Sequence, residues 1–307
     1  MVILLLALGF SQTSTFREML RDKIVALANK ELNGKLSIGK IDGTIFTSMF
    51  LRNTIVSMDG DTLLNAGLVE VKVSPLQIFL KRIYVRKVKL SDTKVAFIAD
   101  SNGSLNISRL FPPTPKDTSH SKFPFKIVVP DLQLTNVNFS LQDYNKVNSN
   151  EEYESINMHD FRVKDINLSL SALADIANNS FELKINSFSF TPNLKNFMLN
   201  NLSGEFFVDT NGVYVNNFKL LTNGTELNLK AKIDKFNLFD STAISKLGDD
   251  PLDINLKATK FSFDELSSFI PSSSLLKGTI SVNLKSTGSL KELNLKRLDA
   301  TYLDTHL

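Results

Sequence analysis

The chain has 307 residues, of which 42% are apolar, and its 35 basic and 32 acidic residues leave a net charge of +3. This near balance gives no general case for nucleic-acid binding, and the absence of Cys excludes disulfides and thiolate chemistry. The aromatic residues are 23 Phe and 5 Tyr, with no Trp. Since Phe supplies apolar area without a polar group, this composition favours a dry apolar surface over a sugar-binding site.

The N-terminus is apolar from Val2 to Phe10. A helix needs about 20 residues to span a bilayer, so this run is too short by itself. It fits the apolar part of a signal peptide, although no basic residue precedes it. We therefore expect residues 1–13 to be a truncated membrane anchor or signal segment. The alternative is a buried first element of a soluble protein.

A helix is predicted from Thr15 to about Leu32. Thr15 and Glu18 form a Thr-x-x-Glu capping box, and Asn33-Gly34 supplies a stop signal. One apolar stripe runs along the helix, because apolar residues recur every three to four positions: Phe16, Leu20, Ile24 and Leu27.

From Leu36 onward the sequence alternates apolar with polar residues at period two, which predicts strands with one apolar and one polar face. The pattern is clearest at Phe181–Ile185, Leu227–Ile233 and Ile280–Lys285. Three short helical segments interrupt it: Leu76–Leu80, Ala172–Ala177 and Phe263–Ile270. We therefore predict a mainly β protein built from one long antiparallel sheet.

The parity of the apolar positions reverses within several predicted strands. It changes between Val85 and Val88, between Ile185 and Phe188, and between Val215 and Phe218. A bulge or bend is needed at each reversal if the apolar side chains are to stay on one face.

Residues 112–124 are rich in Pro, Ser and Thr and read as a linker. The predicted organisation is then a helix and first β unit over residues 14–111 and further β repeats over 125–307. A weak repeat relates Ile83–Phe97 to Val128–Phe139, since both read strand, polar pair, strand. The alternation still runs near Leu298, so the sequence is expected to be a fragment of a longer chain.

The sequence predicts no catalytic, cofactor or metal site. His120, His159 and His306 lie far apart without paired ligand spacing. The best phosphate-loop match, Gly34–Lys40, is followed by Ile41 where Ser or Thr would meet magnesium. We therefore expect a protein that is not an enzyme.

One basic cluster stands out: Lys81, Arg82, Arg86, Lys87 and Lys89. A solvated strand face explains it most simply. The alternative is a contact to anionic lipid headgroups.

Two stretches carry a resemblance to a known family. They are GKLSIGKIDGTIF (Gly34–Phe46) and the series Val69–Phe111, which ends in Asp100-Ser-Asn-Gly-Ser-Leu-Asn106. Together with LKGTISVNLKSTGSLKELNLKRLDA (Leu276–Ala300), they resemble the AsmA-like superfamily, which includes the TamB-type translocation and assembly module proteins.

The resemblance implies a bacterial envelope protein anchored in the inner membrane, with its bulk in the periplasm. It implies a curled β-sheet whose apolar groove carries phospholipid acyl chains toward the outer membrane. It also implies a role in outer-membrane protein assembly, in addition to lipid transport or in place of it. A region beyond this sequence would contact an outer-membrane barrel protein. Neither a cofactor nor nucleic acid is implied.

A groove for acyl chains needs a long apolar floor, and each buried methylene is worth about 0.8 kcal/mol. The predicted floor residues are Phe181, Leu183, Ile185, Leu227, Leu229, Ile280, Val282 and Leu284. These residues would otherwise fill a closed β core, as in a β-solenoid or β-sandwich binding module such as an adhesin stalk. An outer-membrane barrel and an enzyme assembled from distant residues are the remaining alternatives.

Overall fold

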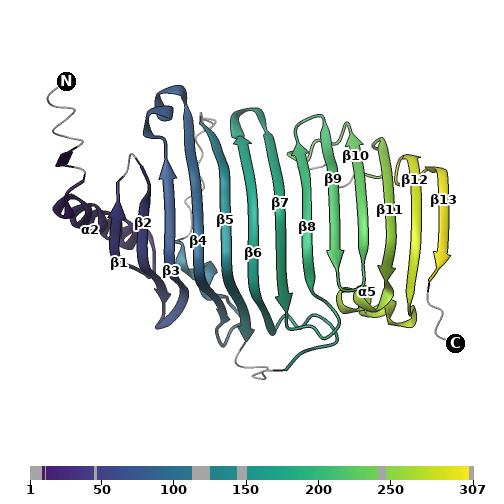
Figure 1. The fold of residues 1–307 in the computed structure, drawn as a ribbon, viewed down its shortest axis with the longest axis horizontal. Helices are drawn as coiled ribbons and strands as arrows, with labels where there is room; N and C mark the ends of the chain where they lie inside the picture. Colours follow the sequence, from purple (N-terminus) through teal and green to yellow (C-terminus); the bar gives the residue numbers. More distant parts are fainter. Residues whose placement is uncertain are drawn as a thin grey trace. The chain divides into compact units, whose positions relative to one another are not determined.

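The structure is a computed structural model that describes residues 9–10, 12–44, 47–112, 125–143, 151–240 and 247–303. It confirms the predicted mainly β fold: thirteen strands form one open sheet in chain order (Figure 1). The printed pairs from β1 to β4 and from β7 to β13 are antiparallel. The strands are β1 (Lys35–Gly43), β2 (Met49–Met58), β3 (Asp61–Val73), β4 (Arg82–Ala99), β5 (Lys126–Asp143), β6 (Asp160–Asp175), β7 (Ser180–Pro192), β8 (Leu199–Val208), β9 (Gly212–Thr222), β10 (Glu226–Asp234), β11 (Leu252–Ser262), β12 (Thr279–Gly288) and β13 (Leu293–Tyr302).

The chain divides into two compact units. The first comprises residues 1–121, 129–151 and 157–167, and the second comprises residues 122–128, 152–156 and 168–307. The predicted linker, apart from Pro112, lies outside the described residues, as does most of the predicted anchor over residues 1–13. Within the described ranges, no helix has both the length and the apolarity that a membrane crossing requires.

The predicted first helix is present as α2 (Ser14–Glu31), but its predicted capping box is wrong. The N-cap is Thr13, whose hydroxyl accepts a 3.2 Å hydrogen bond from the backbone N–H of Phe16. Thr13 precedes the helix by one residue and has extended backbone, as an N-cap requires, whereas Thr15 is already helical. Helix α2 also contacts β1, where the Asn29 side chain hydrogen-bonds both the N–H and the C=O of Leu36.

The first unit has a small hydrophobic core beneath the short helix α3 (Asn106–Leu110). Met58, Leu63 and Leu110 are buried in it, and Leu32, Val56 and Ile107 pack around them. A Cβ at Gly34 would lie 2.5 Å from both Leu110 Cδ1 and Ser57 O. This close approach, rather than a helix stop, is the reason why glycine is needed at that position.

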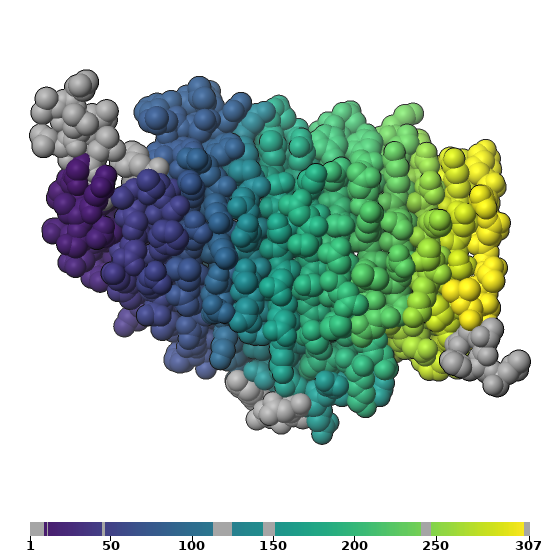
Figure 2. Space-filling view, viewed as in Figure 1, coloured from purple at the N-terminus to yellow at the C-terminus, as the bar shows by residue number. Residues whose placement is uncertain are grey.

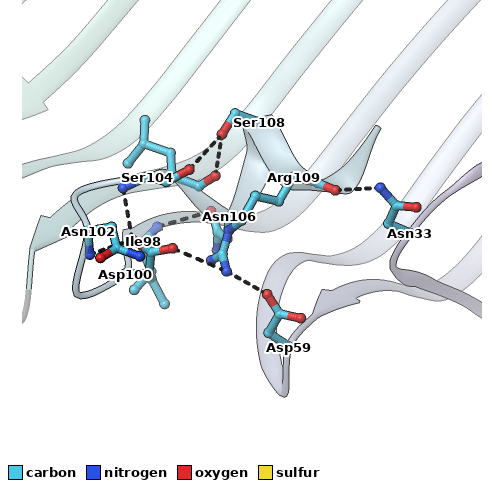
Figure 3. A network of polar contacts seen from close by, with 10 residues as sticks. Asn33, Asp59, Ile98, Asp100, Asn102, Ser104, Asn106, Ser108 and Arg109 are labelled. Atoms are coloured by element: carbon cyan, nitrogen blue, oxygen red, sulfur yellow. Dashed lines mark hydrogen bonds and ion pairs between the residues drawn. The ribbon is translucent and has the colours of Figure 1, made fainter. Parts of the chain in front are cut away.

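The loop before α3 folds the Asp100–Asn106 segment against β4 (Figure 3). The Asp100 carboxylate accepts hydrogen bonds from the N–H groups of Asn102 and Ser104, and Gly103 has φ +79°. Asn106, which is fully buried, binds Ile98 N and Ala96 O of β4 through its side-chain amide. The segment is therefore an ordered turn whose Asn106 side chain supplies hydrogen-bond partners to two backbone groups of β4.

Four strands of the first unit contain an Asn or Asp in the left-handed conformation: Asn53, Asp92, Asn136 and Asp165. Each sits where the apolar positions change parity, and its polar side chain is exposed. Asn136 Nδ2 donates a 2.7 Å hydrogen bond to Asp92 Oδ1. The polar pairs of the predicted repeat, Ser91-Asp92 and Thr135-Asn136, thus each mark a parity reversal, one in β4 and one in β5.

The three predicted parity reversals are all confirmed as register shifts. The β3–β4 pairing shifts between Lys72 and Val73, opposite the step from Val88 to Val85. The β7–β8 pairing shifts between Ile185 and Phe188. The β9–β10 pairing shifts where Val215 is followed by Phe218, next to Asn217 with φ +52°.

The predicted helical turn at Leu76–Leu80 and one of the two predicted short helices are present. Pro75–Leu80 forms the 3₁₀ helix η1, and Phe263–Phe269 forms α5, which Ser262 caps through the N–H of Glu265. The helix predicted at Ala172–Ala177 is wrong. Strand β6 continues to Asp175, and only the 3₁₀ turn η2 (Ile176–Asn178) follows, because pairing within the sheet outweighs the helix propensity of this Ala-rich run.

Candidate functional site: the apolar face of strands β7 to β13

One face of strands β7–β13, all in the second unit, carries the predicted floor residues. Residues directly opposite each other in an antiparallel pair project from the same face of the sheet. The register therefore traces rows of side chains across the unit. One row contains Leu183, Phe206, Val215, Ala231, Ile254, Ser286 and Leu295.

A second row passes through Leu229 and a third through Leu227. The second contains Phe218, Leu229, Leu256, Leu284 and Leu298. The third contains Leu202, Leu220, Leu227, Ala258, Val282 and Ala300. Phe181 and Ile185 flank Leu183 at period two on β7, and Ile280 flanks Val282 on β12. The structure therefore brings all eight predicted residues onto one surface, called the apolar face below.

The apolar face is only partly covered. Phe181 is 40% exposed, and the other seven predicted residues are half-buried. Among the described residues of this unit, the buried apolar side chains are Leu194, Leu199, Phe236, Leu252 and Ala258. In the described part of the unit, the elements other than strands are η2, α5 and η3 (Pro271–Leu275), and Figure 1 shows α5 at the ends of the strands rather than across the sheet.

Sequence reasoning missed several residues of this face. Phe206 lies in the first row, and Phe218 and Leu256 lie in the second. The rings of Phe206 and Phe218 meet edge to face with centroids 6.1 Å apart. Their segments, Leu202–Val208, Val213–Leu220 and Leu252–Ala258, show the same alternation as the predicted ones. The signal was therefore present in the sequence.

Phenylalanine contacts border the apolar face at both ends of β7. Phe239, from the loop after β10, stacks on Phe181 with ring centroids 5.6 Å apart. Near the other end, Phe197 contacts both Phe190 of β7 and Phe269 of α5, at 6.2 and 4.7 Å. The rings add apolar area where the strands stop.

The opposite face of these strands is polar and charged. Lys184 lies 3.0 Å from Glu205 across the β7–β8 pair, and this hydrogen bond lowers the pKa of Glu205. Lys232 hydrogen-bonds Asp234 at 2.8 Å, and this bond raises the pKa of Lys232. Both pairs are exposed, so they contribute little to stability. They do mark this face as the one that water covers.

A polar pocket of about 470 Å³ lies at the strand ends near α5. Its lining is Lys195, Asn196, Asn223, Gly224, Ser262, Asp264 and Glu265. The Glu265 carboxylate is buried and accepts 2.5 Å hydrogen bonds from Thr222 Oγ1 and Gly224 N. The pocket is too polar for an acyl chain, and Glu265 acts there as a clamp on the β9–β10 turn.

Replacing Glu265 with Ala should lower the free energy of unfolding by about 2 kcal/mol, because hydrogen bonds to a buried charged group are lost. Urea denaturation followed by circular dichroism measures this change. Asp264→Ala is the matched control, since its carboxylate is exposed and only pairs with Lys277 at 3.4 Å. Equal effects of the two substitutions would contradict the clamp.

No metal-binding arrangement of three or more His, Cys, Asp or Glu residues occurs within the described ranges. His159 Nδ1 lies 3.5 Å from the Asp143 carboxylate in the first unit. His120 and His306 lie outside the described residues.

The apolar face is thus a partly exposed surface of apolar side chains across strands β7 to β13. Comparison with protein-family models, curated proteins and solved structures finds no match to this chain.

Proposed function

We propose that the apolar face of β7–β13 binds phospholipid acyl chains and carries them between the two membranes of a bacterial envelope. The observation that carries this proposal is that eight apolar residues share one face without being buried. In a closed core these side chains would be covered. A contiguous apolar surface that is left partly exposed marks a binding site.

The dimensions of the second unit suit an acyl chain. Seven strands at about 4.8 Å spacing extend the apolar face by roughly 29 Å. This compares with about 15 Å for one leaflet of a bilayer whose hydrocarbon core is about 30 Å thick. Acyl chains can therefore lie across the strands with length to spare.

The uniformity of the apolar face favours movement along it. Each methylene taken out of water contributes about 0.8 kcal/mol wherever it lies on a Leu, Val, Ile or Phe surface. The rows contain no charged residue, so a chain that slides from one strand to the next exchanges similar contacts. Release into water is costly, whereas displacement along the face is not.

Phospholipid that remains bound after purification tests the proposal. The full chain is purified in a mild detergent, extracted with organic solvent and analysed for phospholipid by mass spectrometry. We expect phospholipid in amounts comparable to the protein. A protein free of phospholipid, in a preparation that retains its β circular-dichroism signal, would contradict the proposal and favour a non-enzymatic module that binds other partners.

The envelope location, the inner-membrane anchor and the contact to an outer-membrane barrel protein belong to the same proposal. An assembly role for outer-membrane proteins would use the apolar face for extended polypeptide instead of lipid. Lipid analysis of the purified chain separates these two cargoes.

A further inference from the structure

An exposed apolar turn joins β3 and β4 in the first unit. It is η1 (Pro75–Leu80), and none of its residues is buried. The exposed fractions are 82% for Phe79, 75% for Leu76, 64% for Leu80 and 53% for Ile78. We call η1 the apolar turn. In Figure 1 it lies at the upper end of these strands, and in Figure 2 this part of the chain forms the surface there.

Backbone hydrogen bonds hold the apolar turn in this exposed position. Ser74 N donates to Tyr84 O at 2.9 Å and closes the base of the turn. Gln77 N and Lys81 N bond Ser74 O and Ile78 O within it, and Lys81 ends it with φ +54°. The exposure of the four apolar side chains is therefore a property of an ordered turn.

The residues that follow the apolar turn are basic. From Val71 to Ser91 the sequence contains six Lys or Arg and no acidic residue. Lys87 pairs with Glu70 at 3.3 Å. Lys81, Arg82 and Arg86 are exposed, and the structure gives them no ion-pair partner among the described residues. The turn thus carries apolar side chains at its tip and uncompensated positive charge at its base.

We propose that the apolar turn inserts into the headgroup region of an anionic lipid bilayer, with Lys81 and Arg82 contacting the lipid phosphates. Interfacial segments bind membranes through buried apolar area together with attraction of basic residues to anionic lipids. Both parts are present here, at the end of one hairpin. This site is separate from the apolar face, which lies in the other unit, and does not depend on it.

The second unit contains a turn that serves as a matched control. In η3 and the residue after it, Leu275 is 91% exposed and Leu276 is 50% exposed. The neighbouring cation, Lys277, lies 3.4 Å from the Asp264 carboxylate. This turn therefore matches the apolar turn in exposed leucine but lacks its uncompensated charge.

The chain has no Trp, so Phe79→Trp provides a single fluorescent reporter in the 307-residue chain. The probe is vesicles made of equal parts phosphatidylcholine and phosphatidylglycerol. We expect the Trp emission to move to shorter wavelength on vesicle addition and to be quenched by brominated acyl chains. Leu275→Trp should show neither change. If Phe79→Trp also shows neither change, the proposal is overturned, even where the protein binds vesicles through another segment.

Charge and apolar contributions are separated by flotation with the same vesicles. Lys81→Gln with Arg82→Gln should weaken binding to the anionic vesicles about 30-fold, and Leu76→Ser with Phe79→Ser should also weaken it. Leu275→Ser with Leu276→Ser should leave binding unchanged. Equal binding by all three double variants would refute insertion of the apolar turn. Equal insertion of the Phe79→Trp reporter into pure phosphatidylcholine vesicles would refute the role of the positive charge.

Discussion

Leu229→Asp is expected to remove most of the phospholipid that co-purifies with the protein. Leu229 lies in the middle of the apolar face, directly opposite Phe218 on one side and Leu256 on the other. An acyl chain over this position would have to cover an ionised carboxylate, and the effective cost of removing such a charge from water is several kcal/mol. Since about 1.4 kcal/mol corresponds to a tenfold change, we expect at least a tenfold loss of bound lipid.

Val282→Asp should give the same result from another strand, because Val282 shares its row with Leu227 and Ala258. The measurement is the molar ratio of phospholipid to protein, determined by mass spectrometry of extracted lipid. Thermal unfolding by circular dichroism shows whether each variant is still folded. Both residues are half-buried, so each single substitution is expected to leave the chain folded.

Asn228→Asp and Asn283→Asp are the matched controls. Each introduces the same charge one residue away, on the opposite face of the same strand. They should keep the lipid content of the unaltered chain. If all four variants retain their lipid, or if all four lose it to the same extent, the apolar face does not bind the acyl chains.

The fold was predictable because a strand has a strict period of two. Alternation alone puts Leu227 and Leu229 on one face of their strand, and it does the same for Ile280 and Val282. In the structure these two pairs of residues lie on the same face of the sheet. Even the reversals of parity carried information. The step from Val215 to Phe218 required a residue with irregular backbone between them, and Asn217 has the left-handed conformation there.

Local signals were less decisive where several residues could play one part. Thr13, Ser14 and Thr15 all suit an N-cap, and the apolar pattern does not say which of them has extended backbone. The run from Ala172 to Ala177 has good helix formers, but pairing within the sheet keeps most of it in β6. In both cases tertiary context decided between similar local choices.

The contacts that connect distant parts of the chain could not be predicted from the sequence. Glu265 meets Thr222 and Gly224 only because β9, β10 and β11 are neighbours in the sheet. The exposure of the apolar turn was equally hidden, since Leu76–Leu80 could have packed on a neighbouring element. Hydropathy indicates that a segment is apolar, but only the arrangement of the strands shows whether anything covers it.

The second large effect is expected in the first unit, from Asn106→Leu. Asn106 is fully buried, and its side chain binds the N–H of Ile98 at 3.1 Å and the C=O of Ala96 at 3.3 Å (Figure 3). Leucine fills a similar volume but leaves both backbone groups without a partner. Each such group costs about 1–3 kcal/mol, so the free energy of unfolding should fall by about 2–6 kcal/mol. Urea denaturation followed by circular dichroism measures the loss.

Asn102→Leu tests whether the effect comes from the buried hydrogen bonds or from the change of residue type. Asn102 lies in the same loop, its side chain is exposed, and only its backbone N–H bonds the Asp100 carboxylate. This substitution should therefore change the free energy of unfolding by less than about 0.5 kcal/mol. If Asn106 holds the loop and α3 against β4, Asn106→Leu should lower the free energy of unfolding much more than Asn102→Leu. Similar losses for the two variants would show that the loop does not depend on Asn106. Because α3 supplies Leu110 to the hydrophobic core around Met58 and Leu63, the loss at Asn106 should spread to that core and lower the cooperativity of unfolding as well as its midpoint.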